Sequence, residues 1–126
     1  MYLERDFSMM YPDFSGISKD LINKFATEQN IHLHYNEQSL EFVDNYIDDV
    51  RDDLEETEAF LLAEDVGCFL GEMIISNYGG KWKYINKCEQ WAITFGGDNN
   101  FFPVHHSMKK VLEKADQSIL EIYKSI

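Results

Sequence analysis

Residues 39–56, SLEFVDNYIDDVRDDLEE, decide the fold of this 126-residue chain. Large apolar side chains recur in this stretch at three- and four-residue steps, as in the apolar stripe of an amphipathic helix. Ser39 precedes the stripe at the position of an N-cap, and we expect the helix to break near Glu55 and Glu56. The stripe consists of Leu40, Val43, Ile47, Val50 and Leu54, with Phe42 and Tyr46 beside it.

Nearly all of the net charge lies in the same region. The chain carries 23 acids and 11 bases, a formal net charge of −12, and residues 37–65 hold twelve of the acids and one base, Arg51. Like charges four residues apart on a helix cost roughly 0.2–0.5 kcal/mol per pair. Burial of four large apolar side chains contributes on the order of 6–12 kcal/mol. We therefore expect the helix to form despite the repulsion.

The acidic face of this helix has two interpretations, a solubilising surface or a binding surface. Solubilising faces usually mix Lys with Glu, whereas a folded face of one sign suits a cationic partner and accelerates its approach. We therefore expect binding of a basic protein partner, with Tyr46 as an aromatic hot spot. The predicted partner-binding residues are Glu41, Asp44, Tyr46, Asp48, Asp49, Asp52, Asp53, Glu55 and Glu56.

The rest of the chain predicts further helices and a hairpin. Residues 1–16 resemble an irregular aromatic-rich arm, and residues 31–35 alternate like a short strand or extended segment. The patterns 81–85 and 89–95 predict a β-hairpin with a turn at Asn86 and Lys87, followed by a loop over 96–100. Helices are expected over 18–29, 57–78 capped by Thr57, about 104–115 after Pro103, and 118–124 capped by Ser118.

These elements predict a single α+β domain over residues 1–126, with amphipathic helices on a small antiparallel hairpin or sheet and helices at the C-terminus. A two-stranded hairpin is marginal in water, so we expect it to lie against the 57–78 helix, with 31–35 as a candidate third strand. Gly67 and Gly71 share one side of that helix. Because Gly costs about 1 kcal/mol inside a helix, a close approach of packed backbone or of a ligand is expected there.

Several classes of protein are disfavoured by composition. No apolar run approaches the ~18–20 residues of a membrane span. The start, Met-Tyr-Leu-Glu-Arg-Asp, lacks the apolar region of a secretory signal, so a cytoplasmic protein is expected. Cys68 and Cys88 are too few for a disulfide framework. The negative balance argues against nucleic-acid binding, because phosphate contacts need clustered Lys and Arg.

No residue pattern indicates an enzyme or a metal centre, and we predict no catalytic residue, metal or cofactor. His32 and His34 would share one face of a strand and could chelate, but paired zinc-ligand spacings do not occur. The run 48–53 lacks the glycine and alternating ligands of a calcium loop. His105 and His106 would point to different sides of a helix, so at most one of them could join a site. Cys68 lies in an apolar helix and is expected to be a small buried apolar residue.

Glu72 is the best candidate for an acid with a perturbed pKa, because it is embedded in an apolar run. A carboxylate at this position must be paired, hydrogen-bonded or protonated. We favour a structural role, in which Glu72 reaches the hairpin or the helix backbone, over catalysis. An enzymatic or metal-binding domain that uses Glu72 with histidines stays an alternative, as does a regulatory adaptor whose acidic face only solvates.

Several motifs resemble a widespread bacterial family of small uncharacterised domains over roughly residues 37–126. The matching positions are Ser39-Leu40, Asp44, Leu70-Gly71-Glu72, Tyr78-Gly79-Gly80-Lys81-Trp82 and Asn100-Phe101-Phe102-Pro103. The resemblance implies a helix with a Gly-Glu pair, a Gly-Gly-x-Trp start of a hairpin, a loop and a C-terminal helix, and it implies no reaction. Such domains are similar in size to immunity proteins, the small antidotes of secreted bacterial toxins. Our leading hypothesis is therefore an immunity protein that blocks a basic toxin such as a nuclease.

Overall fold

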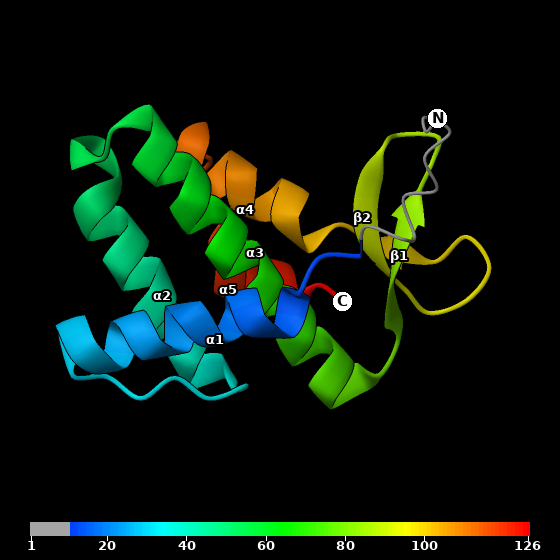
Figure 1. Cartoon of the computed structure of the whole chain (residues 1–126), viewed down its shortest axis with the longest axis horizontal. Helices are drawn as coiled ribbons and strands as arrows, with labels where there is room; N and C mark the ends of the chain where they lie inside the picture. Colours follow the sequence, from blue (N-terminus) through cyan, green and yellow to red (C-terminus); the bar gives the residue numbers. More distant parts are fainter. Residues whose placement is uncertain (1–10) are drawn as a thin grey trace.

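The helix α3 (Glu56–Tyr78) organises the molecule, and the computed structural model describes residues 11–126 around it (Figure 1). The helices α1 (Phe14–Lys24) and α4 (Pro103–Leu112) pack along α3. The acidic helix α2 (Glu37–Val50) packs against the last helix, α5 (Ile119–Lys124). A small sheet lies at one end of this helical layer (Figure 1). The α+β class predicted from the sequence is confirmed.

Two glycines explain how α3 can be packed so closely. A Cβ at Gly67 would lie 2.6 Å from the Cα of Val104 in α4, and a Cβ at Gly71 would overlap the ring of Trp82. The expected close approach is therefore confirmed, and both neighbours are parts of the protein. The cap differs from the prediction, because Glu55 rather than Thr57 precedes α3. Glu55 and Glu58 form a reciprocal capping box there.

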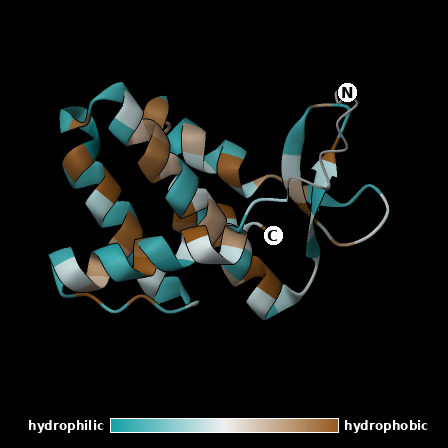
Figure 2. Cartoon of the chain, in the orientation of Figure 1, coloured by the Kyte–Doolittle hydropathy of each residue, from teal (hydrophilic) through white to brown (hydrophobic). Residues whose placement is uncertain are grey.

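The apolar stripe of α2 is confirmed, since Leu40, Val43 and Ile47 are fully buried. Hydrophobic segments of α2 and α3 are visible in Figure 2. The predicted cap at Ser39 is wrong, because Asn36 accepts the hydrogen bond from the Ser39 amide at 2.9 Å. The Ser39 hydroxyl instead accepts from the His34 amide at 2.7 Å. The helix ends at Val50, and a 3-10 turn, η3 (Arg51–Asp53), leads to extended Leu54.

The first helix begins earlier than predicted. Asp13 caps α1 by accepting from the Gly16 amide at 3.0 Å, so the predicted arm is wrong over 14–16 and otherwise lies mostly outside the described residues. Ser18, expected to open the helix, is buried and its hydroxyl lies 2.8 Å from that of Tyr35. A π-helical turn, η2 (Phe25–Gln29), completes the segment. The aromatic residues near the start of the chain suggested an irregular arm, but Phe14 is buried in the core.

The sheet has three antiparallel strands in the order β1 (Lys81–Ile85), β2 (Gln90–Thr94) and β3 (Asn100–Phe101). Trp82 pairs with Ile93, and Ile93 with Phe101. The third strand is therefore Asn100–Phe101, which begins at the last residue of the expected 96–100 loop, and the prediction of 31–35 as a candidate third strand is wrong. That segment connects η2 to α2 without strand pairing, and its Leu33 is buried. The turn of the hairpin spans 86–89.

Aromatic side chains hold the sheet against the helices. Phe14 stacks on Trp82 with ring centroids 3.8 Å apart, and Tyr11 meets Trp91 edge to face at 5.0 Å. The Glu72 carboxylate accepts a hydrogen bond of 2.8 Å from the Trp82 indole. These contacts supply the support that an isolated hairpin lacks.

The C-terminal helices largely follow the prediction. Pro103 occupies the first turn of α4, which ends at Leu112 rather than near 115. Ser118 caps α5 in a capping box with Glu121, as the sequence indicates. Among residues 11–126, no helix is long and apolar enough to cross a membrane.

Candidate functional site

Asp44 does not belong to a binding surface, which corrects the sequence-based prediction. Its side chain is buried on α2, and its two oxygens accept from the backbone amides of Ile119 at 2.8 Å and Leu120 at 3.0 Å. Burial raises the pKa of the Asp44 carboxyl, while the two amides and Lys110 oppose the rise. The residue thus anchors the start of α5 to α2.

Asp48 and Asp52 are exposed, but lysines of the C-terminal part neutralise them. The ammonium of Lys110, only 4 % exposed as a residue, lies 3.0 Å from Asp48, and Arg51 lies 3.7 Å from the same carboxylate. Lys114 pairs with Asp52 and holds the pKa of that carboxyl below its usual range. Sequence periodicity could not reveal the two lysine pairs, because each joins residues 62 positions apart.

Tyr46 also lies elsewhere than expected. Its half-buried ring packs on Phe25 at a centroid distance of 5.0 Å, and the Lys24 ammonium lies 5.8 Å from the ring centroid. Tyr46 therefore belongs to the junction of α2 with η2. The prediction of this side chain as an anchor within the acidic face finds no support in its position.

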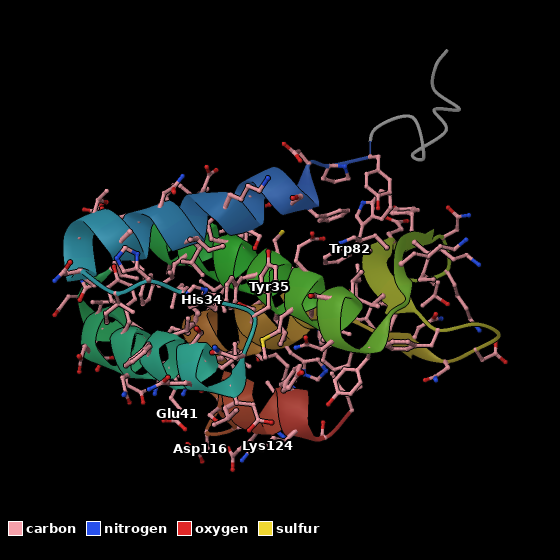
Figure 3. The ribbon with its side chains drawn as sticks, turned by 90° about the horizontal axis from the view of Figure 1, so that it is seen from below. His34, Tyr35, Glu41, Trp82, Asp116 and Lys124 are labelled. Atoms are coloured by element: carbon pink, nitrogen blue, oxygen red, sulfur yellow. The ribbon has the colours of Figure 1, made fainter. Side chains whose placement is uncertain are left out.

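The acids that stay free gather where α2, η3 and α3 meet. Asp49, Asp53 and Glu56 are exposed, and within the described part of the chain none of them forms an ion pair. Glu55 is exposed beside them but serves in the capping box of α3. We name these four residues the acidic corner. Glu41 is exposed as well, and Figure 3 shows it pointing outward from α2.

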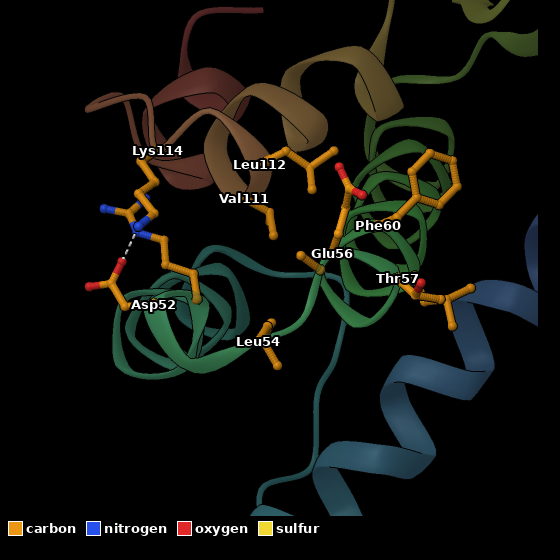
Figure 4. Close-up of a pocket in the computed structure, with 11 residues that line it drawn as sticks. Asp52, Leu54, Glu56, Thr57, Phe60, Val111, Leu112 and Lys114 are labelled. Atoms are coloured by element: carbon orange, nitrogen blue, oxygen red, sulfur yellow. Dashed lines mark ion pairs between the residues drawn. The ribbon is translucent and has the colours of Figure 1, made fainter.

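A groove of about 680 Å³ adjoins the acidic corner (Figure 4). It lies between the start of α3, the turn η3 and the end of α4. Three of its side chains are large, apolar and exposed: Phe60 at 49 %, Leu61 at 53 % and Leu112 at 37 %. The other lining residues are Arg51, Asp52, Leu54, Glu56, Thr57, Ala59, Val111 and Lys114.

Sequence reasoning missed Phe60, Leu61 and Leu112. The consecutive run Phe60-Leu61-Leu62-Ala63 contained a usable signal, because four adjacent positions cover the whole circumference of a helix and cannot all face one core. Leu62 and Ala63 are the buried members of this run.

The candidate catalytic and metal-binding groups do not meet. Glu72 is half-buried and hydrogen-bonded to Trp82, as the structural interpretation expected of a Glu that reaches the hairpin. His32 and His34 are exposed in the segment between α1 and α2 (His34 in Figure 3), and His106 stacks on Phe101 at 5.0 Å. Burial raises the pKa of the Cys68 thiol to about 12. Within residues 11–126, no three His, Cys, Asp or Glu side chains form a group suited to a metal ion.

One further acid has an unusual environment. Asp65, half-buried on α3, lies near Asp20 of α1 and near Glu64. Burial, together with the nearby carboxylates of Asp20 and Glu64, raises the pKa of the Asp65 carboxyl to about 6, although Lys24 opposes the rise. This acid lies near Asp20 and Lys24 of α1, does not line the groove, and bears on stability in the pH range 4–6.

Comparison of the chain with protein-family models, curated proteins and solved structures finds no match. The arrangement of side chains is therefore the basis for inference about function. That arrangement offers free carboxylates beside exposed apolar side chains, a combination suited to protein binding.

Proposed function

We propose that this protein binds a basic protein partner through the acidic corner, and that it serves as an immunity protein that neutralises a bacterial toxin such as a nuclease. The observation that carries the proposal is that the unpaired Glu56 lines one groove with the exposed Phe60, while the unpaired Asp49 and Asp53 lie just before it in the chain. The toxin class rests on the resemblance over residues 37–126 and on the chemistry of nucleases, whose surfaces attract phosphates.

The electrostatics support capture rather than simple solvation. Residues 37–65 carry eleven negative charges in excess, and Lys110, Lys114 and Lys124 reduce this excess to eight by pairing with Asp48, Asp52 and Glu37. A local field of this sign accelerates encounter with a cationic protein, and like-charge repulsion suppresses the approach of acidic proteins. The remaining repulsion between neighbouring acids is relieved when such a partner binds.

A binding role also fits the state of the reactive groups better than catalysis does. Glu72 is engaged by Trp82, and the Cys68 thiol is held in its neutral form by burial. A thiol that stays protonated is a poor nucleophile at neutral pH, and Glu72 already has a structural partner in the hairpin.

The test is affinity capture followed by kinetics. The full chain is used to capture partners, which mass spectrometry identifies, and association rates with the purified partner are measured by surface plasmon resonance from low to high salt. Asp49→Asn, Asp53→Asn and Glu56→Gln are combined in one variant. We expect about tenfold slower association for this variant at low salt, because three steering charges are removed.

The matched control changes three exposed acids elsewhere, Glu28→Gln, Glu89→Gln and Asp98→Asn, and alters the net charge equally. A partner that is basic, and whose association depends on the corner more than on the control positions, supports the proposal. Association that is insensitive to salt, or equally slow for both variants, contradicts it and identifies the acids as a solvated surface.

A further inference from the structure

Half of the exposed large apolar side chains of residues 11–126 lie at one place. These are Phe60, Leu61 and Leu112, and the other three, Tyr11, Tyr78 and Ile126, do not line this groove. A single exposed apolar residue needs no explanation, but three that line one groove mark an interaction site.

The shape of the groove suits an inserted side chain. Figure 4 shows Glu56 between Leu112 and Phe60, with Asp52 and Lys114 on the other side of the gap. Val111 and Ala59, which are 2 % and 6 % exposed, line the same groove, so apolar surface continues inward from the exposed side chains. A groove formed by two helices is a common receptor for a third, amphipathic helix.

The charges around the groove specify the chemistry of its occupant. Both cations that line it are already engaged, because Lys114 pairs with Asp52, while Arg51 lies 3.7 Å from Asp48 and donates to the Lys110 carbonyl at 3.0 Å. Of the acidic corner, Glu56 lines the groove, and it is the one acid of the lining that forms no ion pair within the described residues. A second copy of this chain would bring the same acids against these, so self-association is disfavoured.

We propose that this groove is the docking site for an amphipathic helix of the basic partner, one that presents a row of apolar side chains flanked by Lys and Arg. The apolar row contacts Phe60, Leu61 and Leu112, and a flanking cation meets Glu56. The inference rests on the proposed function and deepens it, because it names the part of the partner that is recognised and separates an apolar anchor from electrostatic attraction.

The test uses two synthetic peptides of roughly 18 residues, a length at which a helix can form. Both contain the same numbers of Lys and Leu. In the first, Leu recurs at three- and four-residue steps, and in the second the Leu positions are scrambled around the helix. Isothermal titration calorimetry against the full chain measures both affinities. We expect the amphipathic peptide to bind about tenfold more tightly.

Two variants assign this preference to the groove. Phe60→Ser should abolish the tenfold preference, because it removes the aromatic anchor, while weak binding of the scrambled peptide persists. Tyr78→Ser is the matched control, since Tyr78 is 55 % exposed on the same helix but lies outside the groove. The control should retain the full preference. Backbone amide shifts at Phe60, Leu61 and Leu112 should change in NMR spectra on addition of the amphipathic peptide.

Failures of the two proposals differ in this experiment. Equal binding of both peptides, or a preference that Phe60→Ser leaves intact, overturns the docking site while electrostatic capture by the acidic corner stands. Absence of binding by either peptide at low salt overturns the docking site and also contradicts recognition of basic segments. Sedimentation of the chain as a dimer that Phe60→Ser dissociates overturns the assignment in favour of a second copy.

Discussion

Asp44 and Asp48 of α2 contact groups of the C-terminal helices, whereas Asp49, Asp53 and Glu56 of the acidic corner are exposed and form no ion pair within the described residues. Asp44 accepts two backbone amides of α5, and Asp48 pairs with the buried ammonium of Lys110. Asp49 and Asp53 have the same chemistry and lie within ten residues of Asp44. The role of an acid in this region therefore depends on the group that packs against its side chain, and local composition alone does not predict that role.

Asp44→Ala should have the largest effect. It leaves the buried amides of Ile119 and Leu120 without an acceptor, and each such loss costs about 1–3 kcal/mol. We expect the free energy of unfolding to fall by about 2–4 kcal/mol in urea titrations followed by circular dichroism. Asp49→Ala, one turn further along the helix and exposed, is the control and should change it by less than about 0.5 kcal/mol. Equal effects of the two variants would show that the comparison is wrong.

Substitution of Asp48 and substitution of Lys110, the two partners of one ion pair, should change the free energy of unfolding by different amounts. Asp48→Asn leaves a buried ammonium without its nearest carboxylate and should lower the free energy of unfolding by about 1–2 kcal/mol. Lys110→Met removes the buried charge itself and should be neutral within about 1 kcal/mol, since the side chain keeps its apolar packing. The same urea titrations measure both variants. A larger loss for Lys110→Met than for Asp48→Asn would indicate that the pair is a net source of stability.

Asp65 extends the comparison to a half-buried acid whose neighbouring carboxylates oppose its ionisation. Its pKa is raised to about 6 in the folded state. Below about pH 4 the carboxyl is protonated in both states and costs nothing. As the pH rises from about 4 through 6, the Asp65 carboxyl ionises more readily in the unfolded state than in the folded state. The free energy of unfolding therefore falls over this range. The full shift corresponds to about 3 kcal/mol, and partial exposure reduces this to about 1 kcal/mol.

Asp65→Asn should therefore raise the free energy of unfolding by about 1 kcal/mol at pH 7.5 and leave it unchanged at pH 4. Urea titrations of the variant and the parent chain across this range isolate the contribution of Asp65 from other groups, including Asp20, Glu64 and Lys24 around it. Asp53→Asn serves as the exposed control and should show no such trend. A constant difference at all pH values would contradict a raised pKa.

The fold was largely predictable because its signals are local. The three- and four-residue spacing of Leu40, Val43 and Ile47 indicated α2, and the Ser118 and Glu121 pattern indicated the start of α5. The third strand was not predictable, because Asn100 and Phe101 form a strand only through pairing with Ile93 and Thr94. Ser39 was assigned as the cap because it adjoins the apolar stripe, yet Asn36, one turn earlier, has the stronger geometry for that role.

The site was less predictable than the fold. The sequence located the acids but could not distinguish Asp44 from Asp49. The groups that engage Asp44 come from residues 110–120, which are distant from α2 in the sequence. Sequence reasoning also assigned Tyr46 as the aromatic anchor from its position beside the acids. The Tyr46 ring instead packs against Phe25. The exposed aromatic ring that lies near an acid of the corner is that of Phe60.

The tight seat of Trp82 on Gly71 has a practical consequence for optical measurements. Both tryptophans of the chain lie in the hairpin, and Gly71 is eleven residues, about 16 Å along α3, from Phe60. Intrinsic emission will therefore report whether the hairpin is seated on the helices and will be nearly silent about events in the groove. Phe60→Trp would add a third emitter at the groove, so that one spectrum could follow folding at one end of the molecule and occupancy at the other.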